Sequence, residues 1–302
     1  MEHLQHLLSN CTLCPRNCGV NRLHRQVGYC GEPADIYAAR AALHMWEEPC
    51  LVGKTGSGTV FFSGCNLKCV FCQNHNIAIG QTGKAITVSR LSEIFLELQQ
   101  KGAANINLVT PTHYIPQIYL ALKEAKAKGL HLPVVYNTGG YEKAESLKLL
   151  DGLIDIYLPD FKYFSSELSS KYSFAPDYCE QARQALAEMY RQTGPCTFNE
   201  QGMLTCGIIV RHLILPGQTK DSKKVLRYLY ETYGNNIWIS IMNQYTPLAH
   251  VSDIPELNHR VTHAEYDRVV NFCIRLGITN AFIQEGETAE ESFIPPFDLD
   301  GV

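Results

Sequence analysis

The chain has 302 residues, of which 45% are hydrophobic and 19% are charged, a composition that excludes an intrinsically disordered protein. Its formal net charge of −4, without a dense run of lysine and arginine, argues against nucleic acid as a main partner. The first residues lack the pattern of a secretory signal, and no run of about 18 apolar residues occurs, so we expect a cytoplasmic protein without a membrane partner.

Residues 1–57 hold five of the 12 cysteines and show no regular alternation of strands and helices, so we expect a small cysteine-rich, metal-binding extension. Four of these cysteines have the spacing C-x2-C-x3-C-x11-C: Cys11, Cys14, Cys18 and Cys30. Four thiols at such short separations can form a tetrahedral zinc site or ligate an iron–sulfur cluster. The spacing does not distinguish these two metals, and four reduced, unliganded cysteines remain the alternative.

Between about residues 58 and 285, apolar segments alternate with helical patterns about six times. The predicted elements are strand 59–64, helix 90–102, strand 105–110, helix 115–129, strand 133–138, helix 141–152, strand 153–160, helix 175–194, strand 204–215, helix 219–234, strand 236–244, helix 262–277 and strand 280–284. Repeated strand–helix units form a parallel sheet through right-handed crossovers. We predict an α/β fold, a partial (β/α)6 TIM-like barrel over 58–285, with a C-terminal tail over 286–302.

Three cysteines follow the first predicted strand: Cys65, Cys69 and Cys72, with the spacing C-x3-C-x2-C. Ligands of such folds bind at the carboxyl ends of the strands, which is where this loop lies. A structural zinc site needs four protein ligands, and only His75 offers a nearby fourth. A [4Fe–4S] cluster on three thiolates leaves one iron free to bind a substrate or cofactor. A zinc site completed by His75, or three unliganded thiols, are the alternatives.

This motif, with Phe71 before its last cysteine, resembles that of the radical S-adenosylmethionine (SAM) superfamily. The stretch GSGTVFFSGCNLKCVFCQN is similar to the activating enzymes of pyruvate formate-lyase and other glycyl radical enzymes, and most of all to a branch with an additional cysteine-rich amino terminus. The resemblance covers residues 58–285. It implies the radical SAM type of partial barrel, a [4Fe–4S] cluster on the three cysteines, and SAM as the second cofactor.

The resemblance also implies the reaction. The open iron binds the amino and carboxylate groups of SAM, and one electron then breaks the C–S bond to give methionine and a 5′-deoxyadenosyl radical, which abstracts a hydrogen atom. The family implies flavodoxin or ferredoxin as the electron donor and a glycyl radical enzyme as a candidate partner. Radical modification of a small molecule or peptide is the second hypothesis, and a non-catalytic iron–sulfur or zinc-binding module is the third.

The segment after the second predicted strand departs from the family pattern. Where the family usually has Gly-Gly-Glu for the SAM amino group, this chain has Thr110, Pro111, Thr112 and His113. Threonine hydroxyls and the Pro111 carbonyl can accept hydrogen bonds from an ammonium group, and a neutral histidine can accept one. We therefore predict cofactor contacts from Thr110, Thr112 and His113, with a simple turn and helix N-cap as the alternative.

Polar residues also end the next predicted strands. Asn137 precedes two glycines that permit close approach of a ligand, although turn chemistry explains the same residues. Asp160 and Lys162 resemble the Asp-x-Lys of the activating enzymes and suit the charged groups of SAM, with a surface ion pair as the alternative. Arg211 matches an arginine that lies near SAM in the family, and His212 should point the opposite way. Candidates for the substrate side follow the sixth strand: Asn243, Gln244 and Tyr245.

Overall fold

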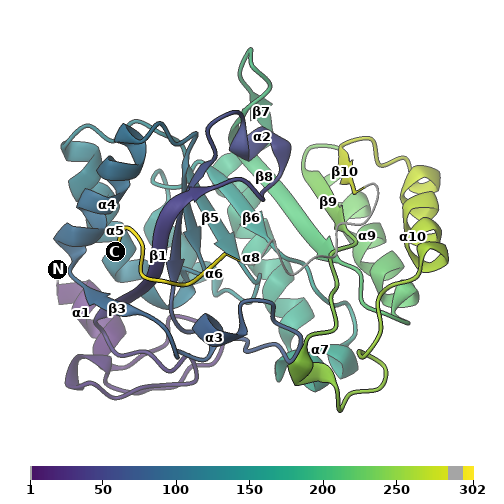
Figure 1. Cartoon of the computed structure of the whole chain (residues 1–302), viewed down its shortest axis with the longest axis horizontal. Helices are drawn as coiled ribbons and strands as arrows, with labels where there is room; N and C mark the ends of the chain where they lie inside the picture. The colour runs from purple at the N-terminus through teal and green to yellow at the C-terminus, as the bar shows by residue number, and fades with distance from the viewer. Residues whose placement is uncertain (1, 285–294) are drawn as a thin grey trace.

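The computed structural model describes residues 2–284 and 295–302 and has an α/β fold (Figure 1). Its strands are β1 Ile36–His44, β2 Ser57–Phe62, β3 Lys84–Ile86, β4 Ile106–Val109, β5 Val134–Thr138, β6 Ile156–Pro159, β7 Thr197–Phe198, β8 Leu204–Leu213, β9 Trp238–Met242 and β10 Ala281–Ile283. Its α-helices are α1 Glu2–Ser9, α2 Pro49–Val52, α3 His75–Ala78, α4 Val88–Gln100, α5 Ile115–Ala127, α6 Ala144–Leu147, α7 Ser166–Ser173, α8 Tyr178–Thr193, α9 Thr219–Tyr233 and α10 His263–Leu276. The 3₁₀ helices are η1 Arg22–His24, η2 Thr112–Tyr114, η3 Lys148–Leu150 and η4 Ala249–Val251.

The sheet has the strand order β10-β9-β8-β6-β5-β4-β2-β1-β3. All neighbours from β2 to β10 along this order are parallel, whereas β1 and β3 are antiparallel and β7 forms a short antiparallel pair with β8. Every strand and helix predicted between residues 58 and 285 forms within a few residues of its predicted position, although the helix predicted over 141–152 is split between α6 and η3. The α/β prediction is confirmed, and the curved sheet is consistent with a partial TIM-like barrel.

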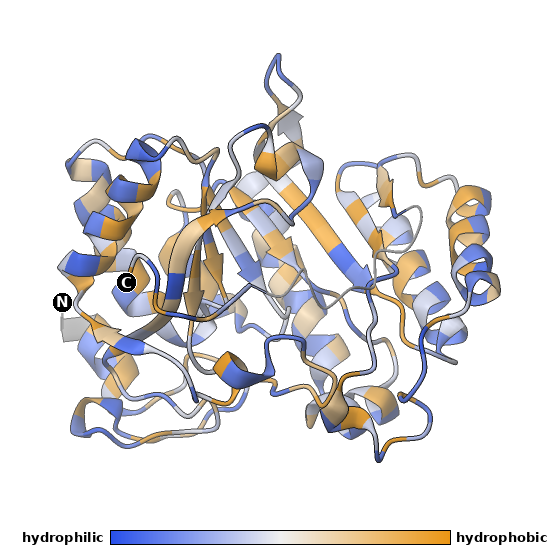
Figure 2. Ribbon diagram, viewed as in Figure 1, coloured by the Kyte–Doolittle hydropathy of each residue, from blue (hydrophilic) through white to orange (hydrophobic). Residues whose placement is uncertain are grey.

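Both faces of the parallel strands are buried, which explains their nearly continuous apolar sequences. In β5, Val134 and Tyr136 belong to the large core under the helices, while Val135 belongs to a second core on the other face, where Leu51 of α2 packs. Figure 2 shows the matching two-sided helices, with apolar residues on one face and polar residues on the other. Within the described parts of the chain, no helix has both the length and the apolar character needed to cross a membrane.

Two segments outside the strand–helix repeat complete the sheet. Strand β1 lies in the predicted amino-terminal extension, yet it pairs with β2 over residues 38–44. The final residues run beside β1, because the Leu299 N–H donates to the Ala39 carbonyl (3.0 Å) and the Ala41 N–H donates to the Asp300 carbonyl (2.8 Å). The predicted barrel–tail boundary at residues 285 and 286 lies outside the described residues.

Candidate functional site

The three-cysteine loop leaves the carboxyl end of β2 through a tight turn at Gly64. This residue has a φ of +83°, and a Cβ atom there would lie 2.9 Å from the Cys30 carbonyl oxygen and 2.4 Å from Glu32 Cγ. Only glycine adopts this backbone and leaves that space open. The turn therefore brings the loop directly against residues 30–32 of the amino-terminal segment.

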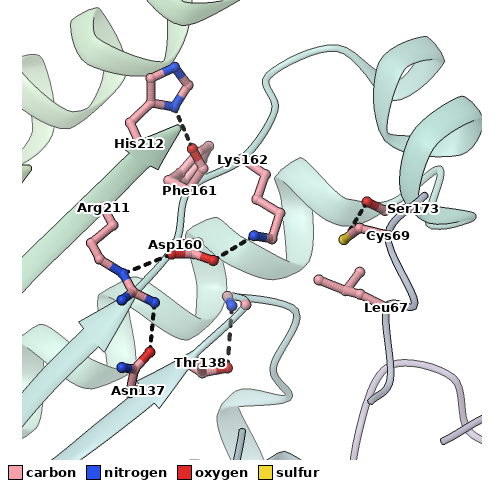
Figure 3. Close-up of polar contacts among 12 residues, drawn as sticks. Leu67, Cys69, Asn137, Thr138, Asp160, Phe161, Lys162, Ser173, Arg211 and His212 are labelled. Atoms are coloured by element: carbon pink, nitrogen blue, oxygen red, sulfur yellow. Dashed lines mark hydrogen bonds and ion pairs between the residues drawn. The ribbon is translucent and has the colours of Figure 1, made fainter. Parts of the chain in front are cut away.

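The three thiols of this loop interact with one another. Cys69 is buried and Cys65 and Cys72 are half-buried. The Ser173 hydroxyl donates to Cys69 Sγ (2.9 Å; Figure 3). The Leu67 N–H donates to Cys65 Sγ (3.4 Å), so two of the sulfurs accept hydrogen bonds. Burial raises the pKa of the Cys69 and Cys72 thiols, and the neighbouring thiolates raise it further. Iron is the kind of cation that stabilises such thiolates.

The donor set of the loop consists of three cysteine thiols. Across residues 2–284 and 295–302, no group of three or more His, Cys, Asp or Glu side chains is arranged to hold one metal ion. His75, the fourth ligand of the zinc alternative, instead stacks on His250 with ring centroids 4.6 Å apart. A [4Fe–4S] cluster assigns each cysteine to a different iron, so its sulfur ligands stand farther apart than those of a single ion. The donor set of the loop fits that cluster.

Phe71, within the cysteine loop, packs against two tyrosine rings. It is buried, and its ring meets Tyr163 and Tyr245 edge to face, with centroid distances of 6.4 and 6.2 Å. The loop also joins the end of β9, since the Gln73 side-chain amide donates to the Gln244 carbonyl (3.0 Å). Aromatic packing thus holds the last part of the loop against the ends of the sheet.

Four of the predicted cofactor residues form one charged network (Figure 3). Lys162 Nζ donates to Asp160 Oδ2 (2.5 Å), and Arg211 Nε donates to Asp160 Oδ1 (3.0 Å). Arg211 also donates to Asn137 Oδ1 (2.6 Å). His212 points away, as predicted, and its Nδ1 donates to the Phe161 carbonyl (2.7 Å). The side chains of this network are largely buried, so the alternative of an exposed surface ion pair is wrong.

Glu47 belongs to this network, although the sequence analysis did not identify it. Its carboxylate accepts hydrogen bonds from Arg211 (3.3 Å), from Asn137 (3.1 Å) and from Asn107 (3.1 Å). Glu47 lies in the loop after β1, whereas the predicted cofactor residues all lie within the strand–helix repeat. An acidic pair, Glu47 and Glu48, next to a proline-started turn was the only sequence signal.

Burial and opposite charges set the protonation states of this network. Burial alone would raise the pKa of Asp160, but Lys162 and Arg211 lower it below its usual value. Asp160 in turn raises the pKa of Lys162 and of Arg211 against the effect of burial. Burial raises the pKa of Glu47 to about 7, against the lowering effect of Arg211. Asp160 is therefore ionised at neutral pH, whereas Glu47 titrates near neutrality.

A cavity of about 420 Å³ adjoins the network and the cysteine loop. Its volume falls within the roughly 300–1,000 Å³ usual for small-molecule sites. Residues from five regions line it: the end of β1 with the loop and turn that follow it, the strands β2, β4, β5, β8 and β9 with the loop after β9, the end of the cysteine loop, β10 with the residue after it, and the C-terminal segment. They are His44, Met45, Trp46, Glu47, Glu48, Pro49, Phe61, Gln73, Asn74, Val109, Asn137, Arg211, Ser240, Met242, Gln244, Phe282, Ile283, Gln284 and Pro295.

The threonines of the Thr-Pro-Thr-His segment do not act alike. Thr112 is fully buried, and its hydroxyl donates to the Glu142 carboxylate (2.5 Å). Thr138 donates to the same carboxylate, as does the Tyr136 hydroxyl (3.3 Å). Thr110 is half-buried and follows Val109, which lines the cavity. Neither threonine is an N-cap residue, since the residues that precede η2 and α5 are Pro111 and Tyr114. The segment nevertheless forms the turn that leads into these helices, with Pro111 at the N-cap position of η2.

His113 lies beneath the Gly64 turn and is buried. Its Nε2 donates to the Ser63 carbonyl (2.6 Å), which leaves Nδ1 as the acceptor, and Nδ1 has no hydrogen-bond partner in the described residues. Burial, together with the nearby Arg22, lowers the pKa of His113 to about 3. The side chain is therefore neutral at physiological pH, the state in which it could accept a hydrogen bond.

The amino-terminal cysteines pack on the other side of the cysteine loop. Tyr29 Oη donates to the Leu67 carbonyl (3.2 Å), and Arg16, between Cys14 and Cys18, donates to the Asn66 carbonyl (2.8 Å). Burial raises the pKa of Cys14 to about 12, and the nearby Cys30 raises it further. The donor set suits a metal chemically, although these thiols too are not arranged around a single ion, as found for the described chain as a whole.

Comparisons with known proteins agree with this geometry. The family model described as the Radical SAM superfamily matches residues 59–229. The uncharacterized protein MJ0674 of Methanocaldococcus jannaschii is 28% identical over 280 residues, which cover 89% of this chain and 76% of that protein. Streptococcus suis SuiB bound to the precursor peptide SuiA matches with a TM-score of 0.51 at 14% identity, over 74% of this chain and 47% of that chain. HydG, a maturase of the [FeFe]-hydrogenase, matches with a TM-score of 0.50 at 16% identity, over 76% and 51%. The chain spans about half the length of these two structures, and the likeness to them is one of fold.

Proposed function

This chain belongs to the radical SAM superfamily, and we propose that it uses a [4Fe–4S] cluster and SAM to abstract a hydrogen atom in the manner of the glycyl-radical-enzyme activases. The observation that carries the proposal is the placement of three interacting thiols at the carboxyl end of the sheet, beside a cavity that adjoins a buried charged network. When bound, the two cofactors supply the one-electron cleavage of SAM and the abstraction of hydrogen.

The residues of the loop would hold and shield the cluster. Cys65, Cys69 and Cys72 would ligate three of its irons, while the Ser173 hydroxyl keeps a hydrogen bond on the Cys69 sulfur. Lys162 lies near enough to Cys69 and Cys72 to lower the pKa of both thiols against burial, and so favours their thiolate forms. Phe71 and its aromatic neighbours exclude water from this side of the loop.

The charged network would orient SAM. Lys162 and Arg211, which both pair with Asp160, would attract its carboxylate, and Asn137 lines the cavity next to Arg211. Thr110 and a neutral His113 remain candidates for its ammonium group. Thr112, whose hydroxyl donates to Glu142, would act by holding the end of β4 against that of β5.

The substrate proposed first is a backbone glycine of a partner glycyl radical enzyme, because the cysteine loop and its flanks are similar to those of the activating enzymes. A small molecule or peptide is the second candidate, favoured by a cavity large enough to enclose a small ligand. SuiB, which shares the fold, is described as bound to a precursor peptide. Anaerobic mixing with candidate glycyl radical proteins separates the two, since only an activase produces their doublet electron paramagnetic resonance (EPR) signal.

We further propose that Cys11, Cys14, Cys18 and Cys30 bind zinc or a second iron–sulfur cluster, that flavodoxin or ferredoxin delivers the electron, and that the protein acts in the cytoplasm. Metal analysis of the anaerobically purified protein and of a Cys14→Ser, Cys30→Ser double variant tests the second site. Loss of one metal equivalent or of one cluster in the variant supports it, and an unchanged metal content contradicts it.

The central experiment is an assay for 5′-deoxyadenosine. After anaerobic reconstitution with iron and sulfide, the protein is mixed with SAM and dithionite. We expect 5′-deoxyadenosine from the wild type and at least a hundredfold less from Cys69→Ala. The matched control Cys273→Ala changes a buried thiol of α10, far along the chain from the loop, and should retain the activity. If the wild type forms no 5′-deoxyadenosine, the proposed function is wrong.

A further inference from the structure

Glu48 is a buried carboxylate with one oxygen that accepts no hydrogen bond in the described residues. Only 8% of the residue is exposed, and its Oε2 has no hydrogen-bond partner in the described parts of the chain. It precedes α2, but its side chain accepts no hydrogen bond from the backbone of that turn. Leaving such an oxygen unsatisfied is unfavourable, and more so for a charged group. A buried carboxylate of this kind indicates that a group absent from the chain itself completes the site.

The neighbouring cations are already engaged by other acceptors. The three nitrogens of the Arg211 guanidinium donate to Asp160, Glu47 and Asn137, and Lys162 donates to Asp160. The network thus places three carboxyl groups, those of Glu47, Glu48 and Asp160, near two basic side chains. Burial raises the pKa of Glu47 to about 7, so an additional positive charge would balance the network in its form with Glu47 ionised.

Glu48 lines the same cavity that borders the cysteine loop. The loop that carries Glu48 begins at His44, which pairs with Ser57 at the amino end of β2, whereas the cysteine loop leaves the carboxyl end of that strand. A ligand that fills the cavity would therefore contact both regions. Met45, Trp46 and Phe282 add apolar and aromatic surface, and an aromatic face also attracts a cation.

We infer that Glu48 binds an alkylammonium group of the substrate, so that the substrate class is an amine-bearing small molecule or a peptide segment with a basic side chain. The inference rests on the proposed radical SAM chemistry in this cavity, and it favours the second substrate candidate over a backbone glycine of a partner protein. The ammonium would anchor the substrate at Glu48, its hydrocarbon portion would contact the apolar lining, and the atom to be attacked would lie toward Gln73 and Asn74, which follow Cys72 directly. Such a remote anchor orients a substrate before reaction.

Calorimetric titration of the reconstituted holoenzyme, saturated with SAM, tests the inference with two probes of equal length, hexylammonium and hexan-1-ol. We expect hexylammonium to bind at least tenfold more tightly than the alcohol, and Glu48→Gln to weaken hexylammonium binding at least tenfold. Glu145→Gln, which removes an exposed carboxylate on α6, is the matched control and should bind like the wild type.

Three outcomes would overturn the inference. Equal affinity for the two probes, or undiminished hexylammonium binding by Glu48→Gln, means that a proton or a water molecule, and not an ammonium group, satisfies the Glu48 carboxylate. A second titration uses the same reconstituted protein without SAM, and a preference for hexylammonium that occurs only there assigns Glu48 to the cofactor instead. The comparison of probes on the wild type needs no variant, so a poorly folding Glu48→Gln protein would not leave the question open. A wild type that forms 5′-deoxyadenosine but shows no preference contradicts this inference alone, whereas one that forms none contradicts the proposed function.

Discussion

Glu142 anchors the Thr-Pro-Thr-His segment, which stands where the family usually has Gly-Gly-Glu. Its carboxylate is fully buried at the ends of β4 and β5 and accepts hydrogen bonds from Thr112, Tyr136 and Thr138. Burial raises its pKa to about 7, although the three hydroxyl donors work in the opposite direction. The Thr-Pro-Thr-His segment therefore has a structural anchor in the place where a family member would carry a glycine-rich turn.

The raised pKa of Glu142 predicts a pH dependence of stability. The unfolded chain loses this proton at about pH 4.5, whereas the folded protein keeps it up to about pH 7, so the folded state binds more protons between these values. The stabilising contribution is complete below pH 4.5 and is lost as the pH rises through 7. Glu142→Gln keeps the shape and cannot titrate. We expect urea unfolding to show that the loss of stability between pH 5 and pH 8 is about 1–3 kcal/mol smaller in this variant than in the wild type.

The pKa of Glu47, in another part of the barrel, is also raised, so this residue too makes stability fall with rising pH. Glu142→Gln should therefore lose only part of the pH dependence of stability seen in the wild type. Glu145→Gln serves again as the control and should retain the full slope. An identical pH dependence in the wild type and Glu142→Gln would show that the Glu142 carboxylate is ionised in the folded protein.

The Ser173 hydroxyl predicts an electrochemical effect. It donates to Cys69 Sγ (2.9 Å), and hydrogen bonds to the cysteine sulfurs raise the reduction potential of iron–sulfur clusters because they stabilise the more negative, reduced form. Ser173→Ala should therefore lower the midpoint potential of the loop's cluster, measured by EPR-monitored titration. Ser169→Ala removes another buried hydroxyl of α7, one that donates to the Ser166 carbonyl, and should leave the potential unchanged. An unshifted potential in Ser173→Ala would mean that the hydrogen bond does not persist beside the cluster.

At the scale of elements, the amino-terminal segment and the cysteine loop form one unit. Arg16 donates to the carbonyls of Asn66, Ser173 and Phe174, and thereby joins three segments far apart in the sequence. Its guanidinium also lies over the Tyr29 ring, 3.9 Å from the centroid. The residues between the amino-terminal cysteines therefore do more than space those cysteines, because one of them holds the loop that carries Cys65 and Cys69.

Arg16→Ala should loosen the cysteine loop. Loss of three hydrogen bonds from a charged donor should lower the free energy of local opening by about 1–3 kcal/mol, which corresponds to roughly tenfold or faster amide exchange. Hydrogen–deuterium exchange mass spectrometry of residues 65–74 in the metal-free protein measures this change without any contribution from a cluster. Arg25→Ala is the control, because Arg25 makes an exposed ion pair with Asp35 in the same segment. Equal exchange in Arg16→Ala and Arg25→Ala would contradict the coupling.

At the scale of the whole molecule, the C-terminal residues bind to strand β1, which precedes the strand–helix repeat. Residues 299 and 300 hydrogen-bond to β1, and the Phe297 ring packs edge to face on Phe61, 5.5 Å between centroids. Figure 1 shows the C-terminal segment running across the front of β1. Phe61 and Pro295 both line the cavity, so the C-terminal segment forms part of the cavity wall and also packs on it.

Phe297→Ala tests this closure. Phe297 is half-buried, so its removal should lower the free energy of unfolding by about 1–2 kcal/mol, measured in urea. The exposed Ile274 of α10 provides the control, and Ile274→Ala should change stability by less than about 0.5 kcal/mol. If the two variants are equally stable, the C-terminal segment does not contribute to the folded core.

The sequence by itself determined the strand–helix alternation, the α/β class and the cysteine motif, because hydrophobic periodicity and motif spacing are properties of neighbouring residues. It also predicted Asn137, Asp160, Lys162 and Arg211 as site residues at the strand ends. Such residues meet at one edge of a parallel sheet whatever their separation along the chain. Only the tertiary structure decided that Thr112 donates to Glu142, that Glu47 and Glu48 enter the cavity, and that β1 and the C-terminal residues complete the sheet. These features depend on contacts between segments far apart in the chain, and neither periodicity nor spacing records which distant segment fills a given space.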